Sequence, residues 1–278
     1  MARRYADELT KDDLQKLQKV LLRILDDFSE VCKEHELTYY LDGGTLLGAI
    51  RHQGFIPWDD DIDVVMPRTD YEKLIQIMQK DDRSPFYLQT FHSDPSYWNI
   101  YGKYRLKGTE YADRSTCHLN CDQTIAIDVF PLDQAYSMTS PAVWLRWKAL
   151  KLTDFMIKIK MHVGSRHNRI DRRIYRLLAL PFPLKMLVSL REKIAAIDRK
   201  KRCRYLIQFG SSYSFKKAIF PKEQYENIQS AIFEKKNFSV PAEWHQILSC
   251  VYGDYMQLPP VEKRKPPHRP VYMDLGES

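Results

Sequence analysis

The chain has 278 residues, of which 44% are hydrophobic and 12% aromatic, and this composition excludes an intrinsically disordered protein. The net charge of +7 is unevenly placed, because residues 142–204 hold 18 Lys and Arg against four Asp and Glu while the first half is acidic. A basic block of this kind predicts either a polyanionic partner or a set of solvated helix faces. The five cysteines lack a regular spacing, which favours reduced thiols over disulfides or a zinc site.

Helices and strands alternate in the first half of the predicted fold. Leucines at three- and four-residue steps predict an amphipathic helix over Lys11–His35. A short helix is expected at Leu46–Arg51, and a third follows Pro67 and runs to Gln79. Apolar stretches predict strands at Thr38–Leu41, Ile62–Met66, Phe86–Thr90, Asn99–Leu106 and Thr124–Phe130. Pro131 is expected to stop the last of these strands.

The second half begins with a basic helical segment at 141–205. Trp144 and Trp147 fall among lysines and arginines there, so the segment is expected to lie on an anionic membrane or to pack its apolar stripe on the core. A further helix is expected at Glu243–Tyr252, where Gly253 ends it. The expected fold is α+β with three parts: a mixed-sheet core flanked by helices at 1–140, a basic helical insertion at 141–205, and a C-terminal part at 206–278 that completes the site.

Four carboxylates crowd into five positions ahead of an apolar strand: Asp59, Asp60, Asp61 and Asp63. Like charges this close repel one another, so they require a counter-charge. Side chains two residues apart on a strand point to the same side, so Asp61 and Asp63 are expected to project together while Ile62 faces the core. Paired carboxylates on a rigid strand suit a hard divalent cation such as Mg²⁺. An acidic surface loop is the alternative, but it does not predict the interleaved apolar residues.

A turn made of Gly43, Gly44 and Thr45 lies between a predicted strand and a short helix. Two glycines allow backbone N–H groups to approach a phosphate closely, and the N-terminal end of the helix adds a favourable partial charge. A Gly-Gly pair alone is weak support. Followed about sixteen residues later by Asp-x-Asp on a strand, it indicates a phosphate-binding turn more strongly.

Three basic residues are candidates to hold phosphate. Lys103 and Arg105 alternate along a predicted strand and therefore share a face, and together with Arg51 they could clamp phosphate groups. A solvated sheet edge is the alternative, because Lys and Arg side chains usually lie outside.

The order of strand, Gly-Gly turn, helix and Asp-x-Asp resembles the nucleotidyltransferase fold superfamily and, within it, the LicD family of phosphocholine transferases, which includes fukutin-like proteins. The similarity covers most of the chain and is thinnest over 142–204. Its matching pieces are Asp42-Gly43-Gly44-Thr45-Leu46-Leu47-Gly48, Arg51-His52, Gly54–Asp63, Arg68 with Tyr71, Ile127–Asp133, Tyr252–Met256, Pro259-Pro260, Lys263-Arg264 and His268.

The resemblance implies a Mg²⁺- or Mn²⁺-dependent enzyme that moves phosphocholine from CDP-choline to a sugar hydroxyl and releases CMP. The acceptor would be a teichoic acid or lipopolysaccharide precursor, including a lipid-linked glycan. Asp61 and Asp63 would hold the metal, and Asp128 is the candidate third carboxylate. Asp128 could share the metal or take the proton of the attacking hydroxyl, or it is a turn residue before Pro131.

Two further roles depend on this resemblance. His268, in the Pro-rich tail, is a candidate contact for phosphate or for the leaving group, or else an ordinary surface histidine. A choline headgroup needs an aromatic surface, for which Trp58 and Tyr101 are candidates, although most aromatic side chains belong to a core.

Three other functions stay open at this stage. A ribitol-phosphate or glycerol-phosphate transferase with a CDP donor would use the same acids, and a true nucleotidyltransferase would take an NTP and release pyrophosphate. A non-enzymatic nucleic-acid-binding protein would use the basic block but leave the acids unexplained, so nucleic acid is not the expected partner. The polar Met1–Tyr5 and the short apolar stretch Leu177–Leu190 predict neither a signal peptide nor a membrane span. We therefore expect a cytoplasmic protein, peripheral at most on the inner face of the plasma membrane.

Overall fold

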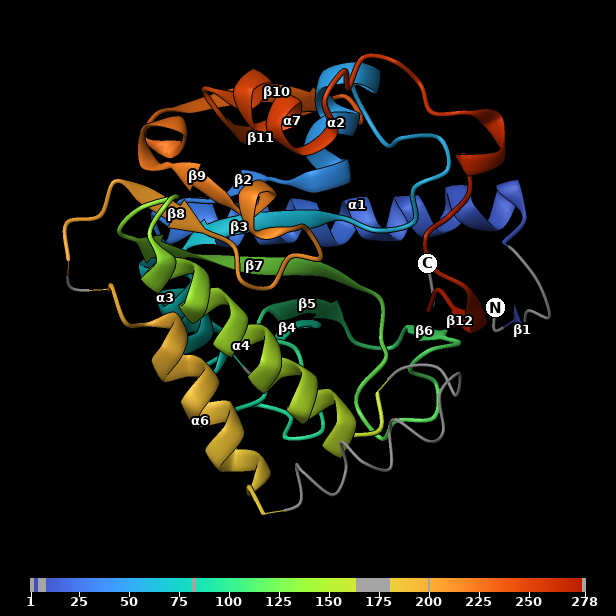
Figure 1. The fold of residues 1–278 in the computed structure, drawn as a ribbon. Helices are drawn as coiled ribbons and strands as arrows, with labels where there is room; N and C mark the ends of the chain where they lie inside the picture. Colours follow the sequence, from blue (N-terminus) through green and yellow to red (C-terminus); the bar gives the residue numbers. More distant parts are fainter. Residues whose placement is uncertain (1–2, 5–8, 82–83, 164–180, 200, 277–278) are drawn as a thin grey trace.

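The computed structural model describes residues 3–4, 9–81, 84–163, 181–199 and 201–276. They form a mixed α/β fold around a seven-stranded sheet, as the sequence predicts (Figure 1). Among these residues, no helix combines the length and the apolar character that crossing a bilayer requires. The main path of the sheet runs β2 (Tyr40–Leu41), β3 (Asp63–Pro67), β7 (Ala126–Ala135), β5 (Gly102–Leu106) and β4 (Phe86–Gln89).

Strand β7 is the longest strand and the centre of the sheet. It pairs in parallel with β3 and antiparallel with β5, and its C-terminal half pairs with β8 (Tyr205–Ile207), which pairs in turn with β9 (Ile219–Pro221). The prediction that Pro131 ends this strand is wrong. Strand β7 pairs with β5 as far as Val129 and with β8 from Asp133 onward. Pro131 lies between these two stretches, so its missing N–H removes no hydrogen bond to β5 or to β8.

The helices follow the predicted periodicity closely. Helix α1 (Lys11–Glu34) begins at the N-cap Thr10, whose hydroxyl accepts from the N–H of Asp13 at 3.1 Å, and its buried leucine face packs on β5 and β7. The remaining helices near the sheet are α2 (Gly43–His52), α3 (Arg68–Met78) and α7 (Trp244–Tyr252). Gly253, with a φ of 72°, ends α7 as expected.

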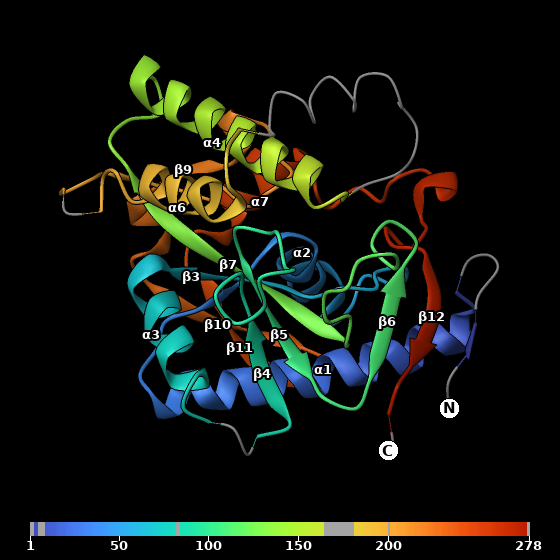
Figure 2. The same ribbon diagram turned by 90° about the horizontal axis from the view of Figure 1, so that it is seen from below.

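The basic segment contributes α4 (Pro141–Lys160) and α6 (Leu184–Ala195), which pack on each other. Figure 2 shows both helices on the side of the strands opposite α1. Val143 and Leu150 of α4 join a buried cluster with Ala135 at the end of β7 and with Ile207 of β8. Residues 164–180 of the predicted insertion lie outside the described residues.

Two smaller sheets come from segments without a clear strand pattern in the sequence. Strand β12 (Pro270–Asp274) pairs with β6 (Glu110–Asp113) and with β1 (Arg3–Arg4). Strands β10 (Ile228–Phe233) and β11 (Lys236–Pro241) form a hairpin whose turn residues Glu234 and Lys235 both have positive φ. Short 3₁₀ turns complete the chain at η1 (Phe215–Lys217), η2 (Lys222–Tyr225) and η3 (Val261–Lys263).

Candidate active site

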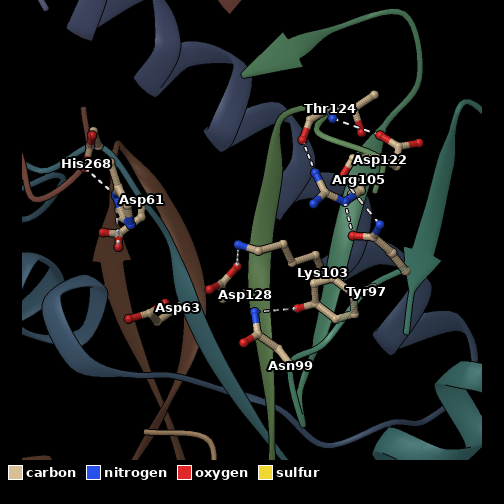
Figure 3. Close-up of polar contacts among 12 residues, drawn as sticks. Asp61, Asp63, Tyr97, Asn99, Lys103, Arg105, Asp122, Thr124, Asp128 and His268 are labelled. Carbon is tan, nitrogen blue, oxygen red and sulfur yellow. Dashed lines mark hydrogen bonds and ion pairs between the residues drawn. The ribbon is translucent and has the colours of Figure 1, made fainter. Parts of the chain in front are cut away.

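A row of three charged side chains, which we call the acid row, crosses three adjacent strands of the main sheet. Asp63 of β3 is in register with Asp128 of β7, and Asp128 is in register with Lys103 of β5. Residues paired across a sheet point to the same face, so the three side chains share one face. Lys103 forms an ion pair with Asp128, and Figure 3 shows Asp61, Asp63 and Asp128 grouped together with Lys103 reaching across. The structure therefore brings together the residues predicted from separate parts of the sequence.

The other acids, Asp59, Asp60 and Asp61, lie in the loop that leads into β3, which we call the acid loop. One carboxylate oxygen each of Asp59, Asp60 and Asp61 lies within 4.8 Å of the other two. Asp61 precedes the strand, which begins at Asp63, but the carbonyl of Ile62 already accepts from the N–H of Asp128 at 2.8 Å. This bond fixes the end of the acid loop against the row.

Electrostatics in this cluster favour a bound cation. Burial raises the pKa of Asp59, Asp61 and Asp63. Neighbouring carboxylates raise the pKa of Asp59 and Asp63 further, whereas the charge of His268 offsets part of the increase at Asp61. For Asp63 the neighbours are Asp61, Asp128, Asp42 and Asp59. Carboxylate oxygens are the ligands that hard divalent cations prefer, so this donor set fits Mg²⁺ or Mn²⁺. Such an ion would remove the repulsion that keeps the carboxyl pKa values high.

Two hydrogen-bonding partners hold the side chain of Asp60 away from cation binding. Its side chain is fully buried, accepts from the hydroxyl of Tyr111 at 2.9 Å and lies 3.0 Å from Nδ1 of His268. Burial of His268 opposes protonation, but the hydrogen bond and charge of Asp60, with the charge of Asp61, raise the pKa of His268 to about 9. Nδ1 of His268 lies 3.9 Å from Asp61, so the predicted tail residue does reach the acids.

The first turn of α2 lies directly against two of the carboxylates. A Cβ added at Gly43, whose φ is +52°, would lie 3.1 Å from Oδ2 of Asp63, and one at Gly44 would lie 2.7 Å from Oδ2 of Asp59. Only glycine leaves this space open, which places the backbone at the N-terminal end of α2 beside the acids. Helix α2 thus begins at the glycines, three residues before the expected Leu46.

Thr45, a predicted phosphate contact, also makes a contact inside the protein. Its buried hydroxyl accepts from the N–H of Asp63 at 2.9 Å. The bond ties the first turn of α2 to the start of β3, so Thr45 positions the strand that carries Asp63.

A cavity of about 210 Å³ lies beside the acid row. Six of the predicted site residues line it: Asp61, Tyr101, Lys103, Arg105, Asp128 and His268. Arg105 is nearly buried, donates through Nε to the side chain of Gln89 at 2.7 Å and also donates to the carbonyl of Thr124 (Figure 3). Much of the hydrogen-bonding capacity of Arg105 is therefore used within the cavity wall, which these bonds stabilise.

Arg51 and Trp58 have other partners outside the lining of this cavity. Arg51, at the end of α2, donates to the carbonyl of Tyr255 at 2.6 Å and to the ring of His52, so it anchors the C-terminal part. The ring of Trp58 has the guanidinium of Arg264 5.8 Å from its centroid, so a cation already covers it. Neither residue lines the cavity beside the acid row, and their predicted phosphate and choline roles stay predictions.

Two tyrosines beside Asp63 are absent from the predicted site. The hydroxyls of Tyr213 and Tyr252 lie 2.8 Å apart and their rings are nearly perpendicular. The Tyr213 hydroxyl is 3.7 Å from the Cβ position of Gly43, and the charges of Asp42 and Asp63 act on both phenols. Tyr252 is part of a recognisable motif, but a pairing across 39 residues leaves no signal in a single sequence.

Comparison with known proteins gives a consistent result. Residues 36–158 match the family model described as LicD/FKTN/FKRP, nucleotidyltransferase domain. The lipopolysaccharide cholinephosphotransferase LicD of Haemophilus influenzae is 30% identical over 269 residues, which cover 94% of this chain and 97% of that protein. Uncharacterized proteins of Rickettsia prowazekii and Rickettsia typhi are 41% and 40% identical over 58 residues, or 21% of this chain and 22% and 19% of theirs. The matched family domain contains the whole acid row.

Proposed function

Since the chain belongs to the LicD family and is a phosphotransferase, we propose that it transfers phosphocholine from CDP-choline to a sugar hydroxyl of a lipopolysaccharide or teichoic acid precursor. The observation that carries the proposal is the row of Asp63, Asp128 and Lys103 beside the acid loop. Phosphoryl transfer depends mainly on positioning and on neutralising charge, and this row offers both on rigid strands.

Asp61, Asp63 and Asp128 would hold the Mg²⁺ or Mn²⁺ ion, and Asp59 is close enough to assist. The ion, when bound, would neutralise the donor phosphates and the departing CMP. Lys103 adds a fixed positive charge next to Asp128. The backbone N–H groups at Gly43 and Gly44 lie on the other side of the acids, at the positive end of a ten-residue helix.

Asp128 is suited to take the proton of the acceptor hydroxyl. The acceptor oxygen would form a bond to the phosphorus of phosphocholine while the bond from that phosphorus to the CMP oxygen breaks, and the hydroxyl proton would pass to Asp128. The ion pair with Lys103 holds the carboxylate of Asp128 in place for this role.

The choline group would require an aromatic surface near the acids. Tyr101, a predicted choline contact, lines the cavity beside the acid row, which is the catalytic cavity of this proposal. The pair of Tyr213 and Tyr252 is a second candidate. A quaternary ammonium group there would be attracted both by the two aromatic rings and by the charges of Asp42 and Asp63.

Peripheral contact with an anionic membrane would bring the enzyme to a lipid-linked acceptor. Helix α4 exposes Trp144, Leu145 and Leu152 by 47%, 62% and 60%, and the ammonium of Lys148 lies 5.3 Å from the Trp144 ring. Apolar side chains interleaved with lysines on one helix suit an anionic lipid surface. We therefore retain the expected place at the inner face of the plasma membrane as part of the proposal.

Of two alternative functions, one is excluded and the other stays open. The family relationship overturns the non-enzymatic nucleic-acid-binding alternative, because it shows a phosphotransferase. A ribitol-phosphate or glycerol-phosphate transferase would use the same acid row and is the reserve hypothesis.

Release of CMP from CDP-choline, with Mg²⁺ and a lipopolysaccharide acceptor, tests the proposal. We expect release that requires Mg²⁺ in the wild type and that is lost in Asp61→Ala and in Asp63→Ala. Activity with CDP-ribitol or CDP-glycerol but not with CDP-choline would keep the mechanism and change the substrate. Inactivity with every CDP donor would overturn the proposal.

A further inference from the structure

A second and larger cavity adjoins the catalytic one. It has a volume of about 440 Å³ and lies between α3, α6 and the segment that leads into β5. Pockets for small organic ligands typically measure about 300–1,000 Å³, so its size suits a ligand of its own. Asn99 and Tyr101 line both cavities and therefore form the wall between them.

This shared wall lies next to the candidate base. Tyr101 is tightly packed on Phe130, with ring centroids 4.2 Å apart, and the charge of Asp128 acts on its hydroxyl. The Asn99 amide donates to the hydroxyl of Tyr97 at 3.3 Å, and Figure 3 shows Asn99 beside Asp128. A ligand in the larger cavity that reached past this wall would meet Asp128.

The lining of the larger cavity combines aromatic rings with polar groups. Tyr71, Phe91 and Tyr101 supply aromatic surface, and Asn99 and Ser189 supply hydrogen-bonding groups. Sugars present C–H faces that pack on aromatic rings and hydroxyls that pair with amide, hydroxyl and guanidinium groups. This lining therefore has the chemistry of a saccharide site.

Arg191 forms a buried part of the cavity wall. Its side chain is 2% exposed, and its terminal nitrogens donate to the carbonyl of Trp98 at 2.6 Å, to Asp154 at 2.9 Å and to the carbonyl of Asn99 at 3.1 Å. Its Nε is buried and has no hydrogen-bond partner among the described residues. The three bonds of the terminal nitrogens hold the Arg191 side chain in place as part of the cavity wall.

Most of the charges around the cavity already have partners, which argues against a polyanionic ligand. Arg68 forms a two-point pair with Asp133. Arg199 pairs with Glu72 at the rim, and His92 lies 2.7 Å from Glu192.

We propose that this second cavity binds the saccharide of the acceptor and presents its hydroxyl past Asn99 and Tyr101 to Asp128. The inference rests on the proposed function, because it assigns the larger cavity to the acceptor and the smaller one to the donor.

Filling the cavity tests the assignment. Ser189→Trp places a large side chain on an exposed position that lines the cavity, and Leu190→Trp places the same side chain on the next exposed position of α6, outside the lining. The probe acceptor is the deacylated core oligosaccharide of lipopolysaccharide. For Ser189→Trp we expect kcat/KM toward this acceptor to fall by about tenfold or more, the scale of pocket-shape discrimination, with the Kd of CDP-choline unchanged. Leu190→Trp should behave as the wild type does.

The outcomes separate this proposal from the proposed function. Direct titration of the oligosaccharide, followed by NMR, should show binding to the wild type and weakened binding to Ser189→Trp, whichever donor the enzyme uses. Equal oligosaccharide affinity in both proteins would overturn the acceptor site while leaving the donor chemistry intact. An equal loss of CDP-choline affinity would also overturn it, because the larger cavity would then serve the donor.

Discussion

Two regions of the molecule are rich in charged residues: the acid loop with the acid row, and the basic helices α4 and α6. Like charges lie together in the first region, whereas opposite charges are paired in the second. In the acid region, partly buried carboxylates lie close together and raise one another's pKa. In the basic region, the buried charges are matched by opposite ones: Arg146 pairs with Asp198 at 2.8 Å, and Arg191 pairs with Asp154 at 2.9 Å. Like charges buried together indicate a site for a ligand, whereas matched buried charges hold helices in place.

The largest expected effect removes one charge from the acid row. Asp63→Asn should lower kcat for CMP release by a factor of about 10³ or more, because in the proposed function it removes a metal ligand and transition-state charge stabilisation. Without metal, its melting temperature should equal or exceed that of the wild type, because a repelling charge is gone. Activity assays and thermal melts in EDTA measure both quantities, and Asp12→Asn on the exposed face of α1 is the control. A strongly destabilised Asp63→Asn would mean that the row is structural.

Breaking a matched pair in the basic region should act on stability instead. Arg146→Ala leaves Asp198 buried without its main partner, since their side chains are 4% and 6% exposed. The free energy of unfolding should fall by about 3–5 kcal/mol in urea titrations. Lys185→Ala, on the exposed surface of α6, should change it by less than about 0.5 kcal/mol. Similar values for the two variants would erase the contrast between buried and surface charge.

The tyrosine pair next to the acid row should act on donor recognition. Tyr213→Ala or Tyr252→Ala should raise KM for CDP-choline about 5- to 30-fold, the equivalent of about 1–2 kcal/mol of cation–π attraction. The KM for CDP-glycerol, if that donor reacts, should stay constant because glycerol carries no cation. Tyr213→Phe keeps the ring and should retain a normal KM. A loss shared by all three variants would assign the role to the hydroxyls.

The exposed face of α4 should determine membrane contact. Replacing both Trp144 and Leu145 by Ala should lower the partition onto phosphatidylglycerol vesicles about tenfold, because two exposed apolar side chains no longer insert. Vesicle sedimentation measures this effect, with Ile228→Ala/Val261→Ala as an equally exposed apolar control. Equal losses in the two double variants would remove the basis for placing the membrane at α4.

The smallest effect concerns the pH dependence of the histidine at the edge of the acid loop. Because the folded pKa of His268 is raised to about 9, the stability that it contributes is full below its ordinary value of 6.5 and is lost as the pH rises through 9. The histidine side chain is 44% exposed, so solvent screening limits the contribution to about 1 kcal/mol. Unfolding titrations in EDTA should show the wild type and His268→Gln differing at pH 6 and converging near pH 10. A constant difference would exclude this pairing.

Sequence periodicity was sufficient to predict α1 and β3, because these depend on neighbouring residues. The expected shared face of Asp61 and Asp63 assumed that the strand starts before Asp63, whereas Asp61 lies in the loop ahead of it. It did not reveal the parallel register that aligns Asp63 with Asp128, since pairing between strands 65 residues apart is decided by tertiary packing. It missed the β10–β11 hairpin because Glu234 and Lys235 stand where glycine or asparagine would signal the turn. The family resemblance supplied Asp128 and His268, and it is confirmed.

The pairing of β12 with β6 has a consequence for the synthesis of the chain. It secures the segment that holds His268 against Asp60, and 208 positions separate these two residues. A ribosome finishes the acid loop, α2 and β3 long before it translates His268. During most of elongation, the buried acid of Asp60 therefore has no histidine to compensate it. A nascent chain that stalls before β12 would carry an assembled sheet with an acid loop that is not yet closed.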